Sequence, residues 1–363
     1  MDLTTEEGVA PWLTNTLGLP CRGASRLAEG YCSYVYRATM ADDTSLIVKH
    51  VKPFAARAQH LALDPDRLTY EHAFLLHTPP FLPPSTPPFP LRLPDPLLFS
   101  KEAHTLLITD HGICPSLKAF LTTPPASLDT AGAKAIGSNL GTFLAGVHNL
   151  SLVRPGILDF FKSNEGGRKV SALVYFVDVL NRARKYGVDV DSKAMGWFKE
   201  VMAREEAIVM GHDTGARARE VLTAGDFWPG NVLVADSEGG EGKELVALDF
   251  ELAKPGLPEF DVGQMAGELW MVRHFTEGQG EGKNLAGVVL EAFLERYDAE
   301  IKVEVDWNRV AIRMGVHLVA ICGIGWEARV GRERVVEVMR KGLELCKRDW
   351  KNDFADYWHI LEV

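Results

Sequence analysis

The sequence predicts an α+β protein with two lobes, a small β-rich N-terminal lobe and a larger helical C-terminal lobe. Three observations predict this class. The first 111 of the 363 residues carry short β-rich runs, the chain after residue 129 has mainly helical apolar spacing, and one hairpin pattern interrupts the helical part. We therefore expect lobes at residues 1–111 and 112–363, with a ligand site in the cleft between them.

The expected N-terminal strands follow one another closely. Residues 25–41 hold two β-rich runs around Gly30, and residues 44–51 form a third run that is rich in β-branched side chains. Residues 68–77 have the apolar spacing of a helix, and residues 105–109 offer one more strand. Residues 78–96 are too dense in proline for a regular helix, and we interpret them as a surface connection.

The C-terminal part shows helical periodicity from its start. Leu140, Phe143, Leu144 and Val147 fall at i, i+3, i+4 and i+7, on one face of a helix. Further helices are expected near residues 170–185, 193–210, 285–298, 307–319 and 332–347. Between them, residues 231–251 (NVLVADSEGGEGKELVALDFE) predict a β-hairpin, with a solvated tip at residues 236–244.

The composition restricts the partners. With 39 basic and 49 acidic residues, the formal net charge is −10, which argues against a nucleic-acid surface or an acidic membrane surface. The N-terminus lacks the pattern of a signal peptide, and the longest apolar run, near residues 314–326, is too short to cross a bilayer. Five cysteines without paired spacing indicate reduced thiols. We expect a cytoplasmic protein; its oligomeric state is not predicted.

The strongest chemical signal is GDFWPGN, followed on the far strand of the hairpin by LDFE. Phosphoryl transfer to a hydroxyl needs a carboxylate for the hydroxyl proton and hard oxygen ligands for Mg²⁺. Asp226 fits the first role, and Asn231 and Asp249 fit the second, because the hairpin returns Asp249 beside the strand that begins at Asn231. Each residue alone is equally typical of a turn or a cap.

GDFWPGNVLV, ALDFE and FDVG together resemble the aminoglycoside phosphotransferase and choline kinase superfamily, over residues 1 to about 345. Within it, RLAEGYCSYVYRA, TSLIVKH and DFWPGN are most similar to methylthioribose kinases and fungal 4-hydroxytryptamine kinases. The resemblance implies a bilobal, protein-kinase-like fold, in which residues 1–111 bind the nucleotide and residues 112–363 bind the substrate and carry the catalytic residues.

The resemblance also implies residue roles. Asp226 would be the catalytic base, and Asn231 and Asp249 would hold the metal. Lys49 would contact the nucleotide phosphates with Glu71 as its ion-pair partner, although a strand lysine is also typical of a solvated edge. Asp261 would brace the loop that carries Asp226. The sequence departs from the family at Ala224, where many members carry histidine, and this puts the geometry of the loop in question.

Further candidates are less specific. Gly30 and Ser33 belong to a loop that would cover the phosphates, although one glycine is typical of any hairpin turn. Asp110 lies in the expected hinge, where it is also a typical turn former. Glu251, Trp228 and Trp270 would face the substrate. Phe227 and Glu268 are further candidates there, and the aromatic residues are equally typical of a core. His148 and His317 are expected to be core histidines.

The sequence thus predicts a phosphotransferase that moves the γ-phosphoryl group of Mg-ATP to a hydroxyl of a small soluble metabolite that resembles a hydroxytryptamine, a thio-sugar or an amino alcohol. Its cofactors would be Mg²⁺ and ATP, the latter as co-substrate. Two alternatives stay open: a kinase-shaped nucleotide-binding protein without catalysis, and an antibiotic phosphotransferase. The absence of an Ala-Pro-Glu segment argues against a protein kinase.

Overall fold

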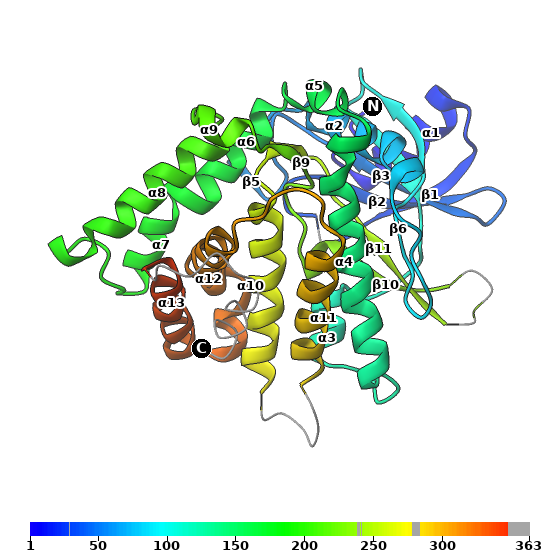
Figure 1. Ribbon diagram of the computed structural model, residues 1–363. Helices are drawn as coiled ribbons and strands as arrows, with labels where there is room; N and C mark the ends of the chain where they lie inside the picture. Colours follow the sequence, from blue (N-terminus) through cyan, green and yellow to red (C-terminus); the bar gives the residue numbers. More distant parts are fainter. Residues whose placement is uncertain (29, 238–239, 241, 278–283, 348–363) are drawn as a thin grey trace. The chain divides into compact units, whose positions relative to one another are not determined.

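The computed structural model describes residues 1–28, 30–237, 240, 242–277 and 284–347 (Figure 1). The chain forms two compact units. The first contains Met1–Pro80, Leu93–Ile113 and Leu248–Glu251, and the second contains Phe81–Arg92, Cys114–Ala247 and the chain from Leu252 onward. Neither unit is one continuous range of the chain. Phe81–Arg92 belongs to the second unit, and Leu248–Glu251 belongs to the first. The expected functional lobes, 1–111 and 112–363, stay a prediction.

The first unit is built on an antiparallel sheet with the strand order β1-β2-β3-β8-β7. Its elements are α1 (Glu6–Leu17), β1 (Cys21–Arg26), β2 (Tyr34–Met40), β3 (Ser45–His50), β4 (Phe54–Ala55), β5 (Ala58–Ala62), α2 (Arg67–His77), β7 (Pro96–Ser100) and β8 (Thr105–Thr109). The predicted strands around Gly30, at residues 44–51 and at residues 105–109 are confirmed, as is the helix at residues 68–77.

Helix α1 was not expected from the sequence. It buries Val9, Trp12 and Leu13 in one cluster with the sheet residues Tyr36 and Val48. The short segment carries Gly8 and Pro11, both poor helix formers, so its local helix propensity is low. Packing against the sheet, rather than local propensity, accounts for the helix.

The second unit is mainly helical. Its elements are β6 (Leu91–Arg92), α3 (Leu117–Thr122), α4 (Thr130–Val153), α5 (Ile157–Phe161), α6 (Glu165–Ala172), a π-helix (Leu173–Val177), α7 (Val179–Lys185), a 3₁₀ turn (Lys193–Met195), α8 (Gly196–Val209), α9 (Thr214–Arg217), β9 (Val221–Thr223), a 3₁₀ turn (Pro229–Asn231), β10 (Val232–Asp236), β11 (Lys243–Ala247), β12 (Lys254–Gly256), α10 (Glu259–Thr276), α11 (Leu285–Glu300), α12 (Trp307–Val330) and α13 (Arg332–Lys347). Helix α4 packs along α11, and α10 packs beside α11 and α12 (Figure 1).

The predicted C-terminal helices are thus present, with one interruption. The helix expected at residues 170–185 is broken by the π-helix, which gives Tyr175 and Phe176 buried positions.

The proline-dense segment is not a plain surface connection. The buried side chain of Asn139 on α4 donates to the carbonyl oxygens of Thr86, at 2.9 Å, and of Phe89, at 2.8 Å. Strand β6 pairs with β11 in parallel. The segment is held by these hydrogen bonds because its prolines leave the main-chain carbonyls without helical partners.

The predicted hairpin is confirmed as the antiparallel pair β10 and β11, in which Val232 lies opposite Ala247. Part of its expected tip falls outside the described residues. Strand β9 pairs with β12 and leads directly into residues 224–231, which connect it to β10. We call residues 224–231 the Asp226 loop.

The apolar run near residues 314–326 was expected to be too short to cross a bilayer. This expectation is wrong, because the run belongs to a longer helix. Helix α12 extends over Trp307–Val330 and, among the described helices, is the one whose length and composition would allow it to cross a membrane. However, 72% of its most apolar window is buried inside the structure. It therefore has the burial of a core helix.

Candidate active site

In the first unit, Lys49 and Glu71 form a buried ion pair. Lys49 lies on the central strand β3, and Glu71 lies on α2. The ammonium of Lys49 donates to Glu71 Oε2 at 2.5 Å, and both side chains are almost inaccessible to solvent. The alternative of a solvated edge lysine is therefore wrong.

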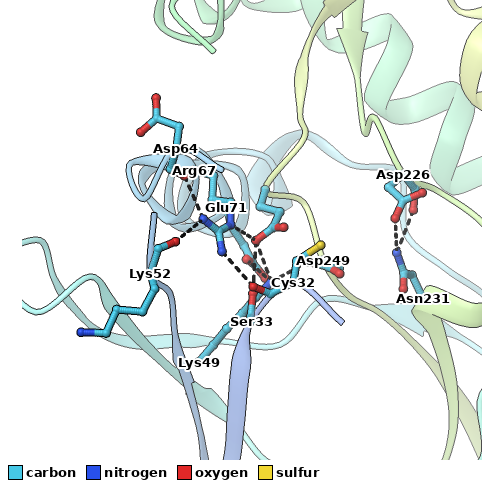
Figure 2. Close-up of polar contacts among 11 residues, drawn as sticks. Cys32, Ser33, Lys49, Lys52, Asp64, Arg67, Glu71, Asp226, Asn231 and Asp249 are labelled. Atoms are coloured by element: carbon cyan, nitrogen blue, oxygen red, sulfur yellow. Dashed lines mark hydrogen bonds and ion pairs between the residues drawn. The ribbon is translucent and has the colours of Figure 1, made fainter. Parts of the chain in front are cut away.

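Two further carboxylates reach the same ammonium. Lys49 Nζ forms an ion pair with Asp249 and lies 3.6 Å from Glu251 Oε2 (Figure 2). The carboxylate oxygens of Glu71, Asp249 and Glu251 all lie within 4.8 Å of one another. Asp249 also has a left-handed backbone, with φ of 67°, which is costly for a residue other than glycine and is concentrated at functional sites.

The neighbouring charges shift the pKa values of Lys49 and Glu71. Burial works to lower the pKa of Lys49, but Asp249, Glu71 and Glu251 raise it well above its usual value, so the ammonium stays charged. Burial raises the pKa of Glu71 to about 7, even though Lys49 pulls it down, and the two neighbouring carboxylates act in the same direction as burial. Lys49 is therefore a buried ammonium that faces the carboxyl groups of Glu71, Asp249 and Glu251.

Arg67 fixes the position of Glu251. Its Nε donates to Glu251 Oε2 at 3.2 Å, and its other nitrogens donate to the carbonyl oxygens of Cys32, Lys52 and Asp64 (Figure 2). Ser33 is buried, and its hydroxyl donates to the same carboxylate oxygen at 3.5 Å. Glu251 is thus held beside Lys49. The substrate-facing role expected for Glu251 stays a prediction.

Gly30 and Asp110 have structural contacts. A Cβ on Gly30 would lie 2.7 Å from the carbonyl oxygen of Ser33, so the tight turn there requires glycine. Asp110 accepts two hydrogen bonds from Arg37 and one from Ser45, at 2.6, 3.0 and 2.7 Å. Burial opposes ionisation of Asp110, but these donors keep its pKa below the usual value. The side chain of Asp110 therefore braces the end of β8.

In the second unit, Asp226 and Asn231 are in direct contact. Asn231 Nδ2 donates to Asp226 Oδ2 and to the main-chain oxygen of Asp226, both at 3.0 Å (Figure 2). Gln264 Nε2 donates to the other carboxylate oxygen, Oδ1, at 2.6 Å. Because the amide nitrogen of Asn231 faces Asp226, its amide oxygen points away and is available to a metal ion.

The Asp226 loop is held by Asp261, as the resemblance implies. The carboxylate of Asp261 accepts from the main-chain N–H groups of Ala224, at 2.7 Å, and Gly225, at 3.0 Å. His148 lies 3.1 Å from the same carboxylate and 2.7 Å from the hydroxyl of Tyr297, so it is a core histidine, as expected. The loop is anchored through its main chain, which does not depend on the side chain at position 224.

The expected substrate-side residues separate into two groups. The ammonium of Lys118 lies 5.2 Å from the centroid of the Trp228 ring and donates to the buried carboxylate of Glu268 at 2.9 Å. Trp270 lies six residues after Gln264 on α10, about 240° around the helix. Trp270 stacks on His274 instead, with centroids 4.9 Å apart. Phe227 is buried and contacts Phe143 in the core.

The structure therefore brings Asp226 and Asn231 together in one unit, and Lys49, Glu71, Asp249, Glu251 and Ser33 together in the other. The convergence of Asp226, Asn231 and Asp249 on one metal ion stays a prediction, because these residues belong to different units. Gln264, Lys118 and Arg67 were missed. Gln264 lies three residues after Asp261, on the same side of α10, and this spacing was the available signal.

Comparison with known proteins identifies the family of the chain. The model of the phosphotransferase enzyme family (APH) matches residues 23–310. The 4-hydroxytryptamine kinase of Psilocybe cyanescens is 28% identical over 359 residues, which cover 94% of this chain and 92% of the relative. That of Psilocybe cubensis is 27% identical over 334 residues, with 88% and 86% covered.

Among solved structures, an aminoglycoside phosphotransferase of Streptomyces rimosus in complex with ADP and streptomycin is 17% identical, with a TM-score of 0.44; the similarity covers 84% of this chain and 97% of that chain. The family match extends over well more than half of the sequence, and it confirms the resemblance and the α+β fold class that the motifs predict. The chain belongs to the phosphotransferase enzyme family and is an ATP-dependent small-molecule kinase.

Proposed function

We propose that this kinase transfers the γ-phosphoryl group of Mg-ATP to the hydroxyl of a hydroxytryptamine-like acceptor. Two relatives named 4-hydroxytryptamine kinase align with nearly the whole chain, at 28% and 27% identity. An amine-bearing acceptor is also compatible with the net charge of −10. The same chemistry on thio-sugars or other amino alcohols is the nearest alternative.

Each unit supports one part of the proposed reaction. In the second unit, Asp226 is proposed as the base that accepts the hydroxyl proton while the oxygen attacks the γ-phosphorus. In the first unit, Lys49 is proposed to neutralise the α- and β-phosphates, with Glu71 holding its ammonium in place. These roles match the functions proposed for the two expected lobes. Residues 1–111 would bind the nucleotide, and residues 112–363 would bind the acceptor.

The donor atoms present fit a magnesium ion. Mg²⁺ prefers hard oxygen ligands and commonly takes one or two carboxylates together with phosphate oxygens. The amide oxygen of Asn231 points away from Asp226, and the carboxylate of Asp249 is 39% exposed. Asp249 also belongs to a group of three carboxylates, with Glu71 and Glu251, whose oxygens lie within 4.8 Å of one another. When bound, the metal would offset the charge of the phosphates.

The observation that carries the proposal is the state of Asp226. Its two carboxylate oxygens each accept a hydrogen bond from a neutral amide, Oδ2 from Asn231 and Oδ1 from Gln264, and these bonds fix the orientation of the carboxylate. Replacement Asp226→Asn should lower kcat by about 10²-fold or more and leave nucleotide binding within twofold, because general bases contribute on this scale. Asp236→Asn, at the exposed end of β10, is the matched control.

An acceptor panel tests the substrate class. Turnover of Mg-ATP should be measured by coupled ADP release with 4-hydroxytryptamine, methylthioribose, choline and streptomycin, and the phosphorylated product should be identified by mass spectrometry. We expect the highest kcat/KM with 4-hydroxytryptamine. Preference for streptomycin would instead favour an antibiotic phosphotransferase, and undiminished turnover by Asp226→Asn would remove Asp226 as the base.

A further inference from the structure

One side of helix α10 contacts the Asp226 loop at successive points. Asp261, Gln264 and Glu268 follow one another at i, i+3 and i+7, which places them along one stripe of the helix. Asp261 binds the start of the loop, and Gln264 binds the carboxylate of Asp226 itself. Glu268 reaches the loop through Lys118, whose ammonium lies over the ring of Trp228. The stripe therefore supports the loop on both sides of Asp226.

Gln264 has a contact that the other two residues lack, because it touches the reacting carboxylate. The distance of 2.6 Å between Gln264 Nε2 and Asp226 Oδ1 is shorter than that between Asn231 Nδ2 and Oδ2, at 3.0 Å. A carboxylate only accepts hydrogen bonds, so the nitrogen end of the Gln264 amide must face it. Gln264 is 3% exposed, and its side chain has little room to move away.

The far end of the same amide borders a small cavity. Gln264, Arg313 and His317 help to line a space of about 10 Å³, which is close to the room that one water molecule needs. Among the described residues, Gln264 Oε1 accepts no hydrogen bond there, and Nε and Nη1 of Arg313 donate none. A water molecule in this space can accept from Arg313 and donate to Gln264, which keeps the nitrogen end toward Asp226.

The chemistry of the contact explains why an amide suits this position. Lysine or arginine would pair with Asp226 and weaken it as a base, and glutamate would repel it. A neutral donor fixes the carboxylate in one rotamer and leaves its charge in place. Asn231 does the same for the other oxygen, so the remaining lone pairs point in directions set by two amides.

We propose that Gln264 is a positioning residue, which holds the carboxylate of Asp226 in the orientation needed to accept the proton of the acceptor hydroxyl. The proposal rests on the proposed role of Asp226 as the base, and it holds for any hydroxyl acceptor, including water. Gln264 acts through Asp226, which its side-chain amide contacts directly.

Three variants of the full-length enzyme test the proposal. Gln264→Met keeps the length of the side chain and removes the donor, Gln264→Glu replaces the donor with a second carboxylate, and Gln264→His restores an N–H donor. Met265→Leu, a volume-conserving change of the next buried residue on α10, is the control. Each variant is assayed for 4-hydroxytryptamine phosphorylation, for Mg-ATP hydrolysis with water as the acceptor, and for ATP affinity and thermal midpoint.

We expect Gln264→Met to lower kcat by about 10- to 100-fold in both assays, because small errors in the placement of a catalytic group cost on this scale. KM for ATP and for the acceptor should stay within twofold. Gln264→Glu should lose more activity than Gln264→Met, and Gln264→His should lose less. The control should match the wild type.

Two results would overturn the proposal: kcat of Gln264→Met within threefold of the wild type, or equal losses in the Met, Glu and His variants that follow their thermal midpoints. The second result would identify a purely structural role. If 4-hydroxytryptamine is not phosphorylated but Mg-ATP hydrolysis still depends on Gln264 in this order, the acceptor assignment fails and the positioning role stands.

Discussion

The carboxylate of Asp261 accepts the main-chain N–H group of Gly225, at 3.0 Å, immediately before the proposed catalytic base. The same carboxylate accepts the N–H group of Ala224, so it anchors the loop without using a side chain of the loop. Gly225 has φ of 85°, and a Cβ there would lie 2.1 Å from the carbonyl oxygen of Leu252, so only glycine fits. Alanine at position 224 is therefore compatible with a well-held loop.

Asp261→Asn should destabilise this loop. Asparagine has one side-chain oxygen in place of two, so one of the two N–H groups, both buried, loses its acceptor. We expect the free energy of unfolding to fall by about 1–3 kcal/mol and kcat to fall by at least tenfold. Urea unfolding and steady-state kinetics measure the two effects, with the exposed Asp159→Asn as the control. Unchanged kcat would show that the loop does not need this anchor.

Lys49→Met should impair nucleotide use. The substitution leaves Glu71 and Glu251 buried without their shared cation, and it removes the charge proposed to face the phosphates. We expect kcat/KM for ATP to fall by about 100-fold or more, as it does when a preorganised charge is lost. Steady-state kinetics and nucleotide titration check this, with the exposed Lys101→Met as the control. Normal ATP affinity and turnover would remove Lys49 from the site.

Gly230→Ala should displace the ring of Trp228. A Cβ on Gly230 would lie 2.1–2.4 Å from atoms of that ring, closer than carbon atoms can pack. Because Trp228 lies between Asp226 and Asn231 in the loop, we expect kcat to fall by about tenfold or more and tryptophan fluorescence to change. Gly196→Ala, where a Cβ meets nothing within 4 Å, is the matched control and should behave as the wild type. A fully active Gly230→Ala would contradict the packing described.

Lys254 should make stability depend on pH in the alkaline range. Burial lowers its pKa to about 8 from the usual 10.5, and its ammonium donates only to Ser171 and the carbonyl oxygen of Leu252 among the described residues. Between pH 8 and 10.5 the unfolded chain binds more protons at this residue than the folded chain does. The free energy of unfolding should therefore rise with pH across this window and lose that contribution as the pH falls through 8.

The variant Lys254→Met isolates this effect. The difference in the free energy of unfolding between wild type and variant should change by about 3 kcal/mol from pH 8 to 10.5, which is the energy that corresponds to a pKa lowered from 10.5 to about 8. Urea unfolding at several pH values measures the difference, and the titration of other groups cancels in it. A difference that stays constant with pH would show that Lys254 titrates normally.

Much of the fold could be predicted because its elements carry strong local patterns. Strand β3 is rich in β-branched residues, α4 has regular apolar spacing, and the β10–β11 hairpin has a polar, glycine-rich tip. Helix α1 and the π-helix could not be predicted, because packing against neighbouring elements determines them. The parallel pairing of β6 with β11 joins residues about 150 apart, and no local pattern reports such a contact.

The site divides in the same way. Asp226, Asn231 and Asp249 stand in a motif with fixed spacing, so the sequence was enough to select them. Trp228 and Trp270 were selected as aromatic residues near the motif, and of the two it is Trp228 that contacts a group linked to the loop. Gln264 and Lys118 lie on helices with no motif of their own, and their importance depends on which side of the helix meets the loop.

The short segment Leu248–Glu251 completes the first unit from the middle of the chain. In this segment, Asp249 pairs with Lys49, and Glu251 pairs with Arg67. The ring of Phe250 stacks on that of Phe74, with centroids 4.0 Å apart. A nascent chain that ends before residue 248 lacks all three contacts. Lys49 and Arg67 are then without the carboxylates of this segment. The N-terminal sheet can therefore reach its final stability only after most of the second unit has been synthesised, which couples the maturation of the two units during translation.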